Sequence, residues 1–519
     1  YSYVISLSEQ LSQFLVLANT KTYLLVQHGC RSSATFIATD DYRKDTTRRP
    51  RVTFGYSLSL SVPTTIVNSN TAYQSICLKT FVDFATLIDI RYENLTTKNL
   101  PPGPTRLPII GNLHLLGDQP HRSLAKLAET HGPIMSLQLG QITTLVISSA
   151  TAKELLQKQD LAFSSRNVPD AMHAHNHARY SVGWLHVGTE WRNLRRILNS
   201  NIFSNSSLEA NQHLRSQKVE ELLAYCRKAS LSNDCVDIGL AAFKTSLNFL
   251  SNTVFSKDLI DSNEDSGIEF KEVIGNILTD VAKPNVVDFF PVLKKIDPKG
   301  IRRRITRNMG KVHEIFDKLI DERLRMGRFK QDDRCIGRII EDNSNEINHT
   351  HKDFCYATHT SSLKPRRSFK KLLVKVKLII QEDDVLRLPY LSCIIKETLR
   401  LHPPVPLLVP RKVNKEVQLN GYTIPGRTQI LVNAWAIARD ATIWDDSLEF
   451  KPKRFLDSVI DVRGQDFDLI PFGAGRRISP GLPLAMHTNI QLEALDMNEK
   501  FGITLSKAKP LCVIPIVLN

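Results

Sequence analysis

The sequence predicts a mainly α-helical globular protein with a small β region. Apolar residues recur three and four positions apart in residues 220–228, 268–281 and 312–324, which is the spacing of an amphipathic helix. Residues 143–148 form a short β-branched run that is typical of a strand. Of the 519 residues, 42% are apolar and 23% are charged, so a large packed core is feasible and wholesale disorder is excluded.

The character of the chain changes abruptly at Pro101-Pro102-Gly103-Pro104, a rigid hinge that excludes helix. Before it, residues 1–97 are rich in Ser and Thr and weak in apolar periodicity, and we expect them to be poorly ordered. Residues 98–519 read as one domain. No run approaches the roughly 18 apolar residues of a spanning helix, so no anchor is visible in the sequence. Because the chain starts with Tyr1, either an N-terminal segment is missing or the protein has no membrane helix.

The formal net charge is +15, and the excess is spread over several basic clusters. Such a surface favours nucleic acid, an anionic membrane or an acidic protein partner. None of the clusters alternates with aromatic residues, as a surface for single-stranded nucleic acid would, and solvated charge is the simplest interpretation. The eight cysteines form no Cys-x-x-Cys and are too few for a disulfide scaffold, so reduced thiols are expected.

Ordered motifs follow in the last third of the chain. A helix predicted over residues 389–401 carries Glu397 and Arg400, three positions apart on one face, a pair that taken alone indicates solvated charge. A hairpin segment at 421–425 and Pro452-Lys453-Arg454-Phe455 come next. Residues 471–481 form a loop whose three glycines let its backbone approach a flat ligand closely.

Taken in this order, the motifs resemble the cytochrome P450 superfamily, and most closely its plant microsomal enzymes of the geraniol hydroxylase type. The resemblance implies a P450-like fold around a haem, partly truncated here, with residues 331–380 and 487–494 divergent or shortened. It implies an oxidoreductase of terpenoid metabolism at the cytosolic face of the endoplasmic reticulum membrane. The implied reaction is that of a monooxygenase, which hydroxylates a small terpenoid-like alcohol with O₂. NADPH supplies the electrons through the partner NADPH-cytochrome P450 reductase.

The resemblance also assigns roles to particular residues. Trp191 and Arg195, four positions apart on one helix, match the pair that reaches a haem propionate, although a plain core aromatic remains an alternative for Trp191. Arg477 matches a loop arginine with the same role, and Phe472 and Gly475 belong to that haem loop.

Three further matches are structural. Glu397 and Arg400 match the family's buried ion pair, and Arg454 matches its third member, with Lys453 standing where the family usually has Glu.

The decisive departure is Ser479, which stands where the family has the Cys thiolate that ligates iron. A serine hydroxyl has a far higher pKa than a thiol and is a poor ligand for this metal. On the distal side, Thr360 matches a catalytic threonine, while His359 replaces an acid and Pro365 interrupts the helix. We therefore expect impaired catalysis even if haem is bound.

Two alternatives remain open. A non-catalytic P450-like scaffold would explain Ser479, and a basic nucleic-acid-binding protein would explain the charge but none of the ordered motifs. Substrate contacts are expected from residues 168–182 and 406–409. Within the first of these, His173, His175 and His177 would share one side of an extended segment, which makes a metal site conceivable but less favoured than a plain loop.

Overall fold

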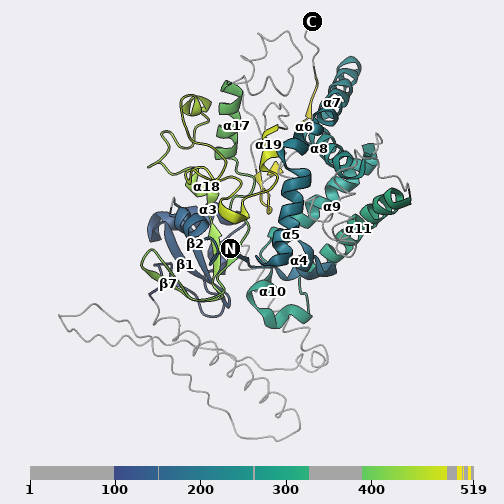
Figure 1. The fold of residues 1–519 in the computed structure, drawn as a ribbon. Helices are drawn as coiled ribbons and strands as arrows, with labels where there is room; N and C mark the ends of the chain where they lie inside the picture. The colour runs from purple at the N-terminus through teal and green to yellow at the C-terminus, as the bar shows by residue number, and fades with distance from the viewer. Residues whose placement is uncertain are drawn as a thin grey trace, which may run out of the picture. The chain divides into compact units, whose positions relative to one another are not determined.

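The structure is a computed structural model that describes residues 99–149, 151–260, 264–325, 389–487, 499–504, 506–507 and 512–515. Figure 1 shows a sheet region, with β1 and β2 in blue, on one side of this part of the chain and a group of long helices, α7, α8, α9 and α11, on the other. The expectations for residues 1–97, 331–380 and 488–494 fall outside the described residues.

The long helices form where apolar residues repeat at helical spacing. In α11, Ile301, Ile305, Met309, Val312 and Phe316 are all buried and follow one another at intervals of three or four residues. The helical elements are η1 (Leu113–Leu115), α3 (Pro120–His131), η2 (Glu154–Lys158), η3 (Asp170–Asn176), α4 (His177–Tyr180), α5 (Thr189–Ile197), η4 (Leu198–Ile202), α6 (Asn205–Ala210), α7 (Gln212–Ser232), α8 (Ile238–Phe255), α9 (Glu264–Ala282), α10 (Val286–Phe289), η5 (Pro291–Lys295), α11 (Ile301–Arg325), α17 (Pro389–Leu401), α18 (Ala434–Ile437), η8 (Pro452–Phe455), η9 (Gly475–Arg477) and α19 (Leu482–His487).

The principal sheet joins strands from distant parts of the sequence in the order β1-β2-β8-β5-β3. β2 pairs with β8 in parallel, and the other neighbours in this sheet are antiparallel. β6 and β7 form the predicted hairpin. The strands are β1 (Ile134–Leu139), β2 (Ile142–Ile147), β3 (Ser165–Arg166), β4 (Val236–Asp237), β5 (Arg411–Lys412), β6 (Val417–Leu419), β7 (Tyr422–Ile424), β8 (Gln429–Val432), β9 (Glu499–Lys500), β10 (Ser506–Lys507) and β11 (Cys512–Val513).

The buried apolar side chains gather in three main clusters. The first lies among α5, α8, α9 and α11, and includes Leu247, Ile277 and Phe316. The second lies under the sheet and includes Phe163. The third lies beside α17 and includes Leu399. Elements that are remote in the sequence are therefore held together around a mainly helical core, which confirms the predicted fold class.

The predicted elements match the structure closely where periodicity is strong. The helix expected over 389–401 is α17, and the strand expected over 143–148 is β2, shifted by one residue. Farther along the chain after α17, residues 406–407 form a turn and Leu408 adopts a left-handed backbone with φ of 49°. In the described part of the chain, no helix has the length and apolar character needed to cross a bilayer.

The carboxylate of Glu397 is completely buried and forms the centre of a polar network beneath α17. Its two oxygens lie 2.7 and 2.9 Å from Nε and Nη2 of Arg400, which is also completely buried. Arg454 of η8 donates to the same carboxylate at 3.2 Å, and the backbone N–H of Lys451 donates at 2.7 Å. A buried charge is tolerated only when it is paired and hydrogen-bonded in this way.

Arg400 extends the network into the chain that follows β8. Its guanidinium donates to the carbonyl oxygens of Ala438 at 2.6 Å, Ser447 at 2.8 Å and Glu449 at 3.1 Å. The guanidinium also lies 5.2 Å from the ring centroid of Trp444. These bonds reach three carbonyl groups of one segment, so Arg400 helps to fix the path of that segment over α17.

We expect Glu397→Ala to lower the free energy of unfolding by about 3–5 kcal/mol, because it leaves two arginines without their buried counter-charge. Urea unfolding followed by circular dichroism measures the loss. Glu269→Ala is the matched control, because Glu269 pairs with Lys311 at 2.8 Å on the surface, where both side chains are at least half exposed. The control should lose less than about 1 kcal/mol. Equal losses in the two variants would contradict a buried network.

Candidate functional site

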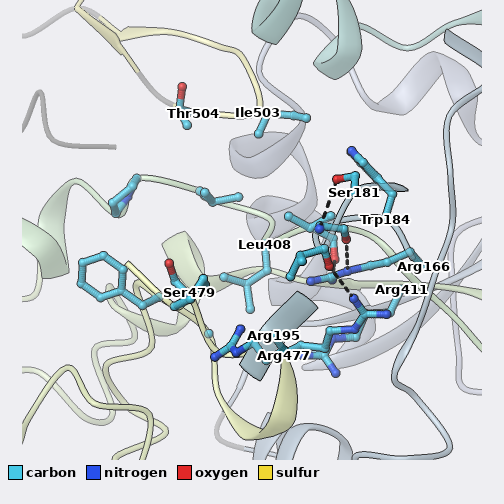
Figure 2. A pocket seen from close by; sticks show the side chains of 18 of the residues that line it. Arg166, Ser181, Trp184, Arg195, Leu408, Arg411, Arg477, Ser479, Ile503 and Thr504 are labelled. Carbon is cyan, nitrogen blue, oxygen red and sulfur yellow. Dashed lines mark hydrogen bonds between the residues drawn. The ribbon is translucent and has the colours of Figure 1, made fainter. Parts of the chain in front are cut away.

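A cavity of about 260 Å³ lies between the helical and sheet regions. Its walls come from α5, the chain on either side of η3, residues 404–411, the loop at 471–480 and the turn that holds Ile503 and Thr504. In Figure 2, Ile503 and Thr504 lie on the side of the cavity away from a group of arginines, and Leu408 lies between them. The cavity therefore has one strongly basic wall and several apolar ones.

The loop at 471–480 owes its shape to glycine and to one ion pair. Gly475 has φ of 67°, and a Cβ there would lie 1.9 Å from the backbone oxygen of Leu156, so only glycine fits. The next residue, Arg476, clamps Asp160 with N–O distances of 2.8 and 2.9 Å. These contacts hold the loop against the chain before β3 and direct Phe472 and Arg477 to the cavity.

Ser479 lies in this loop and lines the cavity. Its backbone N–H donates to the carbonyl of Phe472 at 3.0 Å, which closes the loop on itself. The side chain is half-buried. None of the cysteines in the described ranges lines the cavity: Cys393 is buried on α17, and Cys235 and Cys512 are exposed.

Four arginines form the basic wall, namely Arg166, Arg195, Arg411 and Arg477 (Figure 2). Arg477 is 7% exposed and donates to the backbone oxygens of Ser164 and Val182, each at 3.0 Å, and of Leu185. Within the described residues, none of the four guanidinium groups forms an ion pair with a carboxylate. Arg477, Arg166 and Arg411 donate to neutral carbonyl groups instead.

Arg166 and Arg411 follow the same pattern. Arg166 donates to Val409 at 2.6 Å and to Gly183 at 3.2 Å, and Arg411 donates to Phe163 at 3.3 Å. These three acceptors are all backbone carbonyl oxygens.

The electrostatics of this wall follow from that lack of counter-charge. Burial, reinforced by the charges of Arg411 and Arg195, lowers the pKa of Arg477 to about 9. Burial lowers the pKa of Arg411 to about 10, which the charge of Asp160 partly offsets. The pKa values of Arg166 and Arg195 are also lowered by burial. A concentration of poorly compensated positive charge is suited to bind anionic groups such as carboxylates.

Trp191 and Arg195 both reach the cavity from α5, as their spacing predicts. The indole N–H of Trp191 donates to the carbonyl of Val182 at 3.1 Å, and the guanidinium of Arg477 lies 4.9 Å from the centroid of the indole ring. Trp191 thus contacts the basic wall rather than serving only as a core aromatic.

The cytochrome P450 family model matches residues 101–359 and 369–492. The chain therefore belongs to the cytochrome P450 family, whose members are haem-dependent monooxygenases. The interruption in the match, residues 360–368, contains Pro365. Membership accounts for the ordered motifs, which a nucleic-acid-binding protein would leave unexplained.

The chain is similar to several plant enzymes. The chain is 63% identical over 466 residues to 7-ethoxycoumarin O-deethylase of Helianthus tuberosus, a match that covers 81% of this chain and 95% of that protein. It is 54% identical over 472 residues to geraniol 8-hydroxylase of Catharanthus roseus, covering 82% and 96%. It is 46% identical over 468 residues to geranylhydroquinone 3''-hydroxylase of Arnebia euchroma, covering 81% and 94%. The resemblance to plant geraniol hydroxylases is thereby confirmed.

The residues present fit part of what a haem requires. The basic wall offers several charge-assisted donors to a flat ligand with two carboxylates, and the glycines allow close approach to the loop. The position expected to supply a thiolate offers the hydroxyl of Ser479 instead, which does not fit thiolate ligation.

Sequence reasoning missed two members of the basic wall, Arg166 and Arg411. Neither residue stands in a recognisable motif, and the two come together only through the pairing of β3 with β5. The predicted Thr360 and His359 lie outside the described residues.

The alternating histidines would share one side only in an extended segment. The segment that holds His173, His175 and His177 is not extended but coiled, as η3 and the start of α4. His177 is buried, whereas His173 and His175 are exposed, so the three imidazoles do not share one side. Among the described residues, no cluster of three His, Cys, Asp or Glu side chains could hold a metal.

Two aspartates connect the start of η3 to α10. The backbone N–H of Asp170 donates to Oδ1 of Asp288 in α10 at 2.6 Å, and the buried Asp170 carboxylate lies 3.8 Å from Lys294 and from Arg302. Burial raises the pKa of Asp288 to about 6, and the charge of Asp170 adds to the rise, whereas the Asp170 N–H and Lys294 oppose it. Because η3 carries Met172 into the cavity, this contact positions part of the cavity wall.

The raised pKa of Asp288 predicts a pH dependence of stability. The folded-state value of about 6 exceeds the ordinary value of 3.8, so its contribution is fully present below pH 3.8 and is lost as pH rises through 6. Between pH 5 and 8, the free energy of unfolding of the wild type should fall by about 1.4 kcal/mol relative to Asp288→Asn, whose amide oxygen still accepts the Asp170 N–H.

Urea unfolding of both proteins across that range measures the difference. His173, which faces the same charges and whose pKa burial lowers, is unchanged in both proteins and cancels in the comparison. Parallel profiles would show that Asp288 titrates normally.

Proposed function

We propose that this chain binds haem in the cavity through its arginine wall, and that Ser479 deprives it of thiolate-supported hydroxylation. The observation that carries the proposal is the combination in one cavity of four poorly compensated arginines with a serine at the position where the family has its Cys ligand. The arginines support binding of the two carboxylates of a haem. The serine supports a loss of the iron chemistry that a thiolate ligand would give.

Arg477 and Arg195 would hold the carboxylates of the haem, with Arg166 and Arg411 behind them. Trp191 would orient Arg477 through the face of its ring. Phe472 and Gly475 would form the surface on which the macrocycle rests. The haem supplies oxygen activation when bound, and in the family a thiolate supports that activation.

The distal residues Thr360 and His359 would handle protons on the opposite side of the haem. In that assignment His359 takes the place of the family's acid, and an imidazole that titrates near neutral pH can still carry a proton.

The substrate we propose is a small, largely apolar terpenoid-like alcohol. Support comes from the aliphatic lining contributed by Val405, Leu408, Val409 and Ile503, with the hydroxyl of Thr504 as a polar group among them. The name of the relative from Catharanthus roseus, geraniol 8-hydroxylase, points to the same class. Such a ligand gains affinity mainly from burial of apolar surface.

Electrons would reach the haem as they do in other members of the family, from a reductase. We propose NADPH-cytochrome P450 reductase as the partner and the cytosolic face of the endoplasmic reticulum membrane as the location. The net charge of +15 is consistent with an acidic partner surface.

A second candidate function is a P450-like scaffold without catalysis. The observation that favours it is again Ser479, because every other described feature of the loop would allow a ligand to bind. The two candidates differ in whether any substrate is turned over once haem is bound.

The Ser479→Cys variant tests the proposal. The protein as it stands should bind haem yet give no thiolate-type band in the CO difference spectrum of the reduced form. Ser479→Cys should restore that band, because a thiolate is a far better ligand for this iron than a hydroxyl. Haem content is measured by pyridine haemochrome assay alongside the spectrum, and geraniol serves as the trial substrate.

Ser232→Cys is the control, because it adds a thiol on the exposed end of α7, away from the cavity. It should leave the spectrum unchanged. Turnover of geraniol by the unmodified haem protein would refute the role of Ser479. A Ser479→Cys protein that binds haem without the band would show that residue 479 does not face the iron.

A further inference from the structure

Two thiols remote in the sequence meet on the surface at a short antiparallel ladder. Cys235 ends the turn after α7 and immediately precedes β4, and Cys512 opens β11. In this ladder Cys512 is the partner of Asp237, and Val513 is the partner of Val236. Because side chains alternate along a strand, Cys235, Asp237 and Cys512 lie on the same face of the ladder.

The two thiols lie near one another, because hydrogen bonding and charge from the Cys512 thiol act on the pKa of the Cys235 thiol. Both residues are exposed to solvent. They stand diagonally rather than directly opposite one another, a placement in which Cβ atoms are ordinarily somewhat farther apart than a disulfide requires. Disulfide formation therefore requires a shift of one strand, and the ladder that must yield is only two residues long.

The C-terminal segment that carries Cys512 also forms part of the cavity wall. Ile503 and Thr504 line the cavity, and the backbone N–H of Ile503 donates to Leu278 of α9 at 3.4 Å. Among the described residues, the β9–β10 hairpin holds the turn at Ile503 and Thr504, and the β4–β11 ladder secures the chain farther on, at Cys512. A covalent tie at Cys512 would restrain the same segment that shapes the cavity.

We propose that Cys235 and Cys512 form a reversible disulfide that fastens the C-terminal segment and with it the cavity wall at Ile503 and Thr504. The oxidant is a low-molecular-weight disulfide of the glutathione type. One cysteine thiolate attacks a sulfur of that disulfide and expels a thiolate, which takes up a proton, leaving a mixed disulfide on the protein. The second cysteine thiolate then displaces the remaining small thiol. The two protein thiols are oxidised, and the small disulfide is reduced to two thiols.

The surroundings of Cys235 make this reaction slow at neutral pH and faster in alkali. Desolvation first, and then the hydrogen bond and charge of Cys512 together with the charge of Asp237, raise the pKa of the Cys235 thiol. Only the thiolate attacks a disulfide, so the rate should increase with pH. The tie would therefore form under sustained oxidation rather than under ordinary reducing conditions.

The experiment uses the full-length reduced chain, native and free of added reductant, incubated with glutathione disulfide and quenched with N-ethylmaleimide. Peptide mapping should find a Cys235–Cys512 cross-linked peptide that lacks two hydrogens relative to its reduced halves and that dithiothreitol separates. Hydrogen exchange of residues 503–504 should slow about tenfold after cross-linking, since local opening is restrained. The cross-link should be lost in Cys235→Ser and in Cys512→Ser, and should persist in Cys226→Ser, which alters a half-buried thiol on α7.

Three results would overturn the proposal. Glutathione remaining on both cysteines without a cross-link would show that the thiols cannot approach. A bond from either residue to another cysteine, in the same or a second molecule, would assign the wrong partner. A correct cross-link that leaves exchange at 503–504 unchanged would refute the fastening of the cavity wall. Because none of these readouts requires bound haem, the outcome is independent of the proposed function.

Discussion

The buried carboxylate of Glu397 is the group on which the C-terminal half of the described structure depends. It is completely shielded from water, yet its two oxygens receive both arginines of the network and one backbone N–H. Each partner comes from a different element, so the charge cannot be satisfied unless α17, η8 and the segment before η8 are all in place. A buried ion is costly when any partner is missing, which makes this network a requirement for correct assembly rather than a simple gain in stability.

Arginine stabilises the fold in the Glu397 network, whereas at the cavity it supplies charge for a ligand. Arg400 is matched to a carboxylate, whereas Arg477 and Arg411 are buried against neutral carbonyl oxygens. Carbonyl groups satisfy the hydrogen-bonding needs of a guanidinium but do not neutralise its charge. The fold therefore keeps an excess of positive potential at one wall of the cavity, and an anionic ligand would relieve it. The presence or absence of one acidic partner separates a structural arginine from a binding one.

The sequence predicted the helices whose ends and apolar faces are marked by neighbouring residues. The boundaries of α17 followed from Pro389 at its first turn and from Pro403 just beyond its end, and α11 was detected by its apolar repeat, although its first turns were missed. The turn at Pro406 was not predicted, because nothing nearby in the sequence requires the left-handed backbone of Leu408. That conformation is imposed by packing against the rest of the fold.

The site was predictable only where a family pattern linked its parts. Arg195 and Arg477 were found through motifs, and the structure brings both to the cavity. Arg166 and Arg411 lie in strands β3 and β5, which pair across more than two hundred residues of chain, and no periodicity reports such pairing. The proximity of Cys235 and Cys512 has the same origin, since it depends on a ladder of only two residues on each strand.

The haem loop itself explains why a serine can occupy the critical position without altering the fold. Gly475 sets the close approach to Leu156, and Arg476 is clamped to Asp160. Ser479 contributes its backbone N–H, which any residue other than proline would supply. None of these contacts involves the side chain at position 479. The stability of the loop therefore does not depend on whether the side chain at position 479 carries sulfur or oxygen. The ligand chemistry at this position can change while the geometry of the loop is kept.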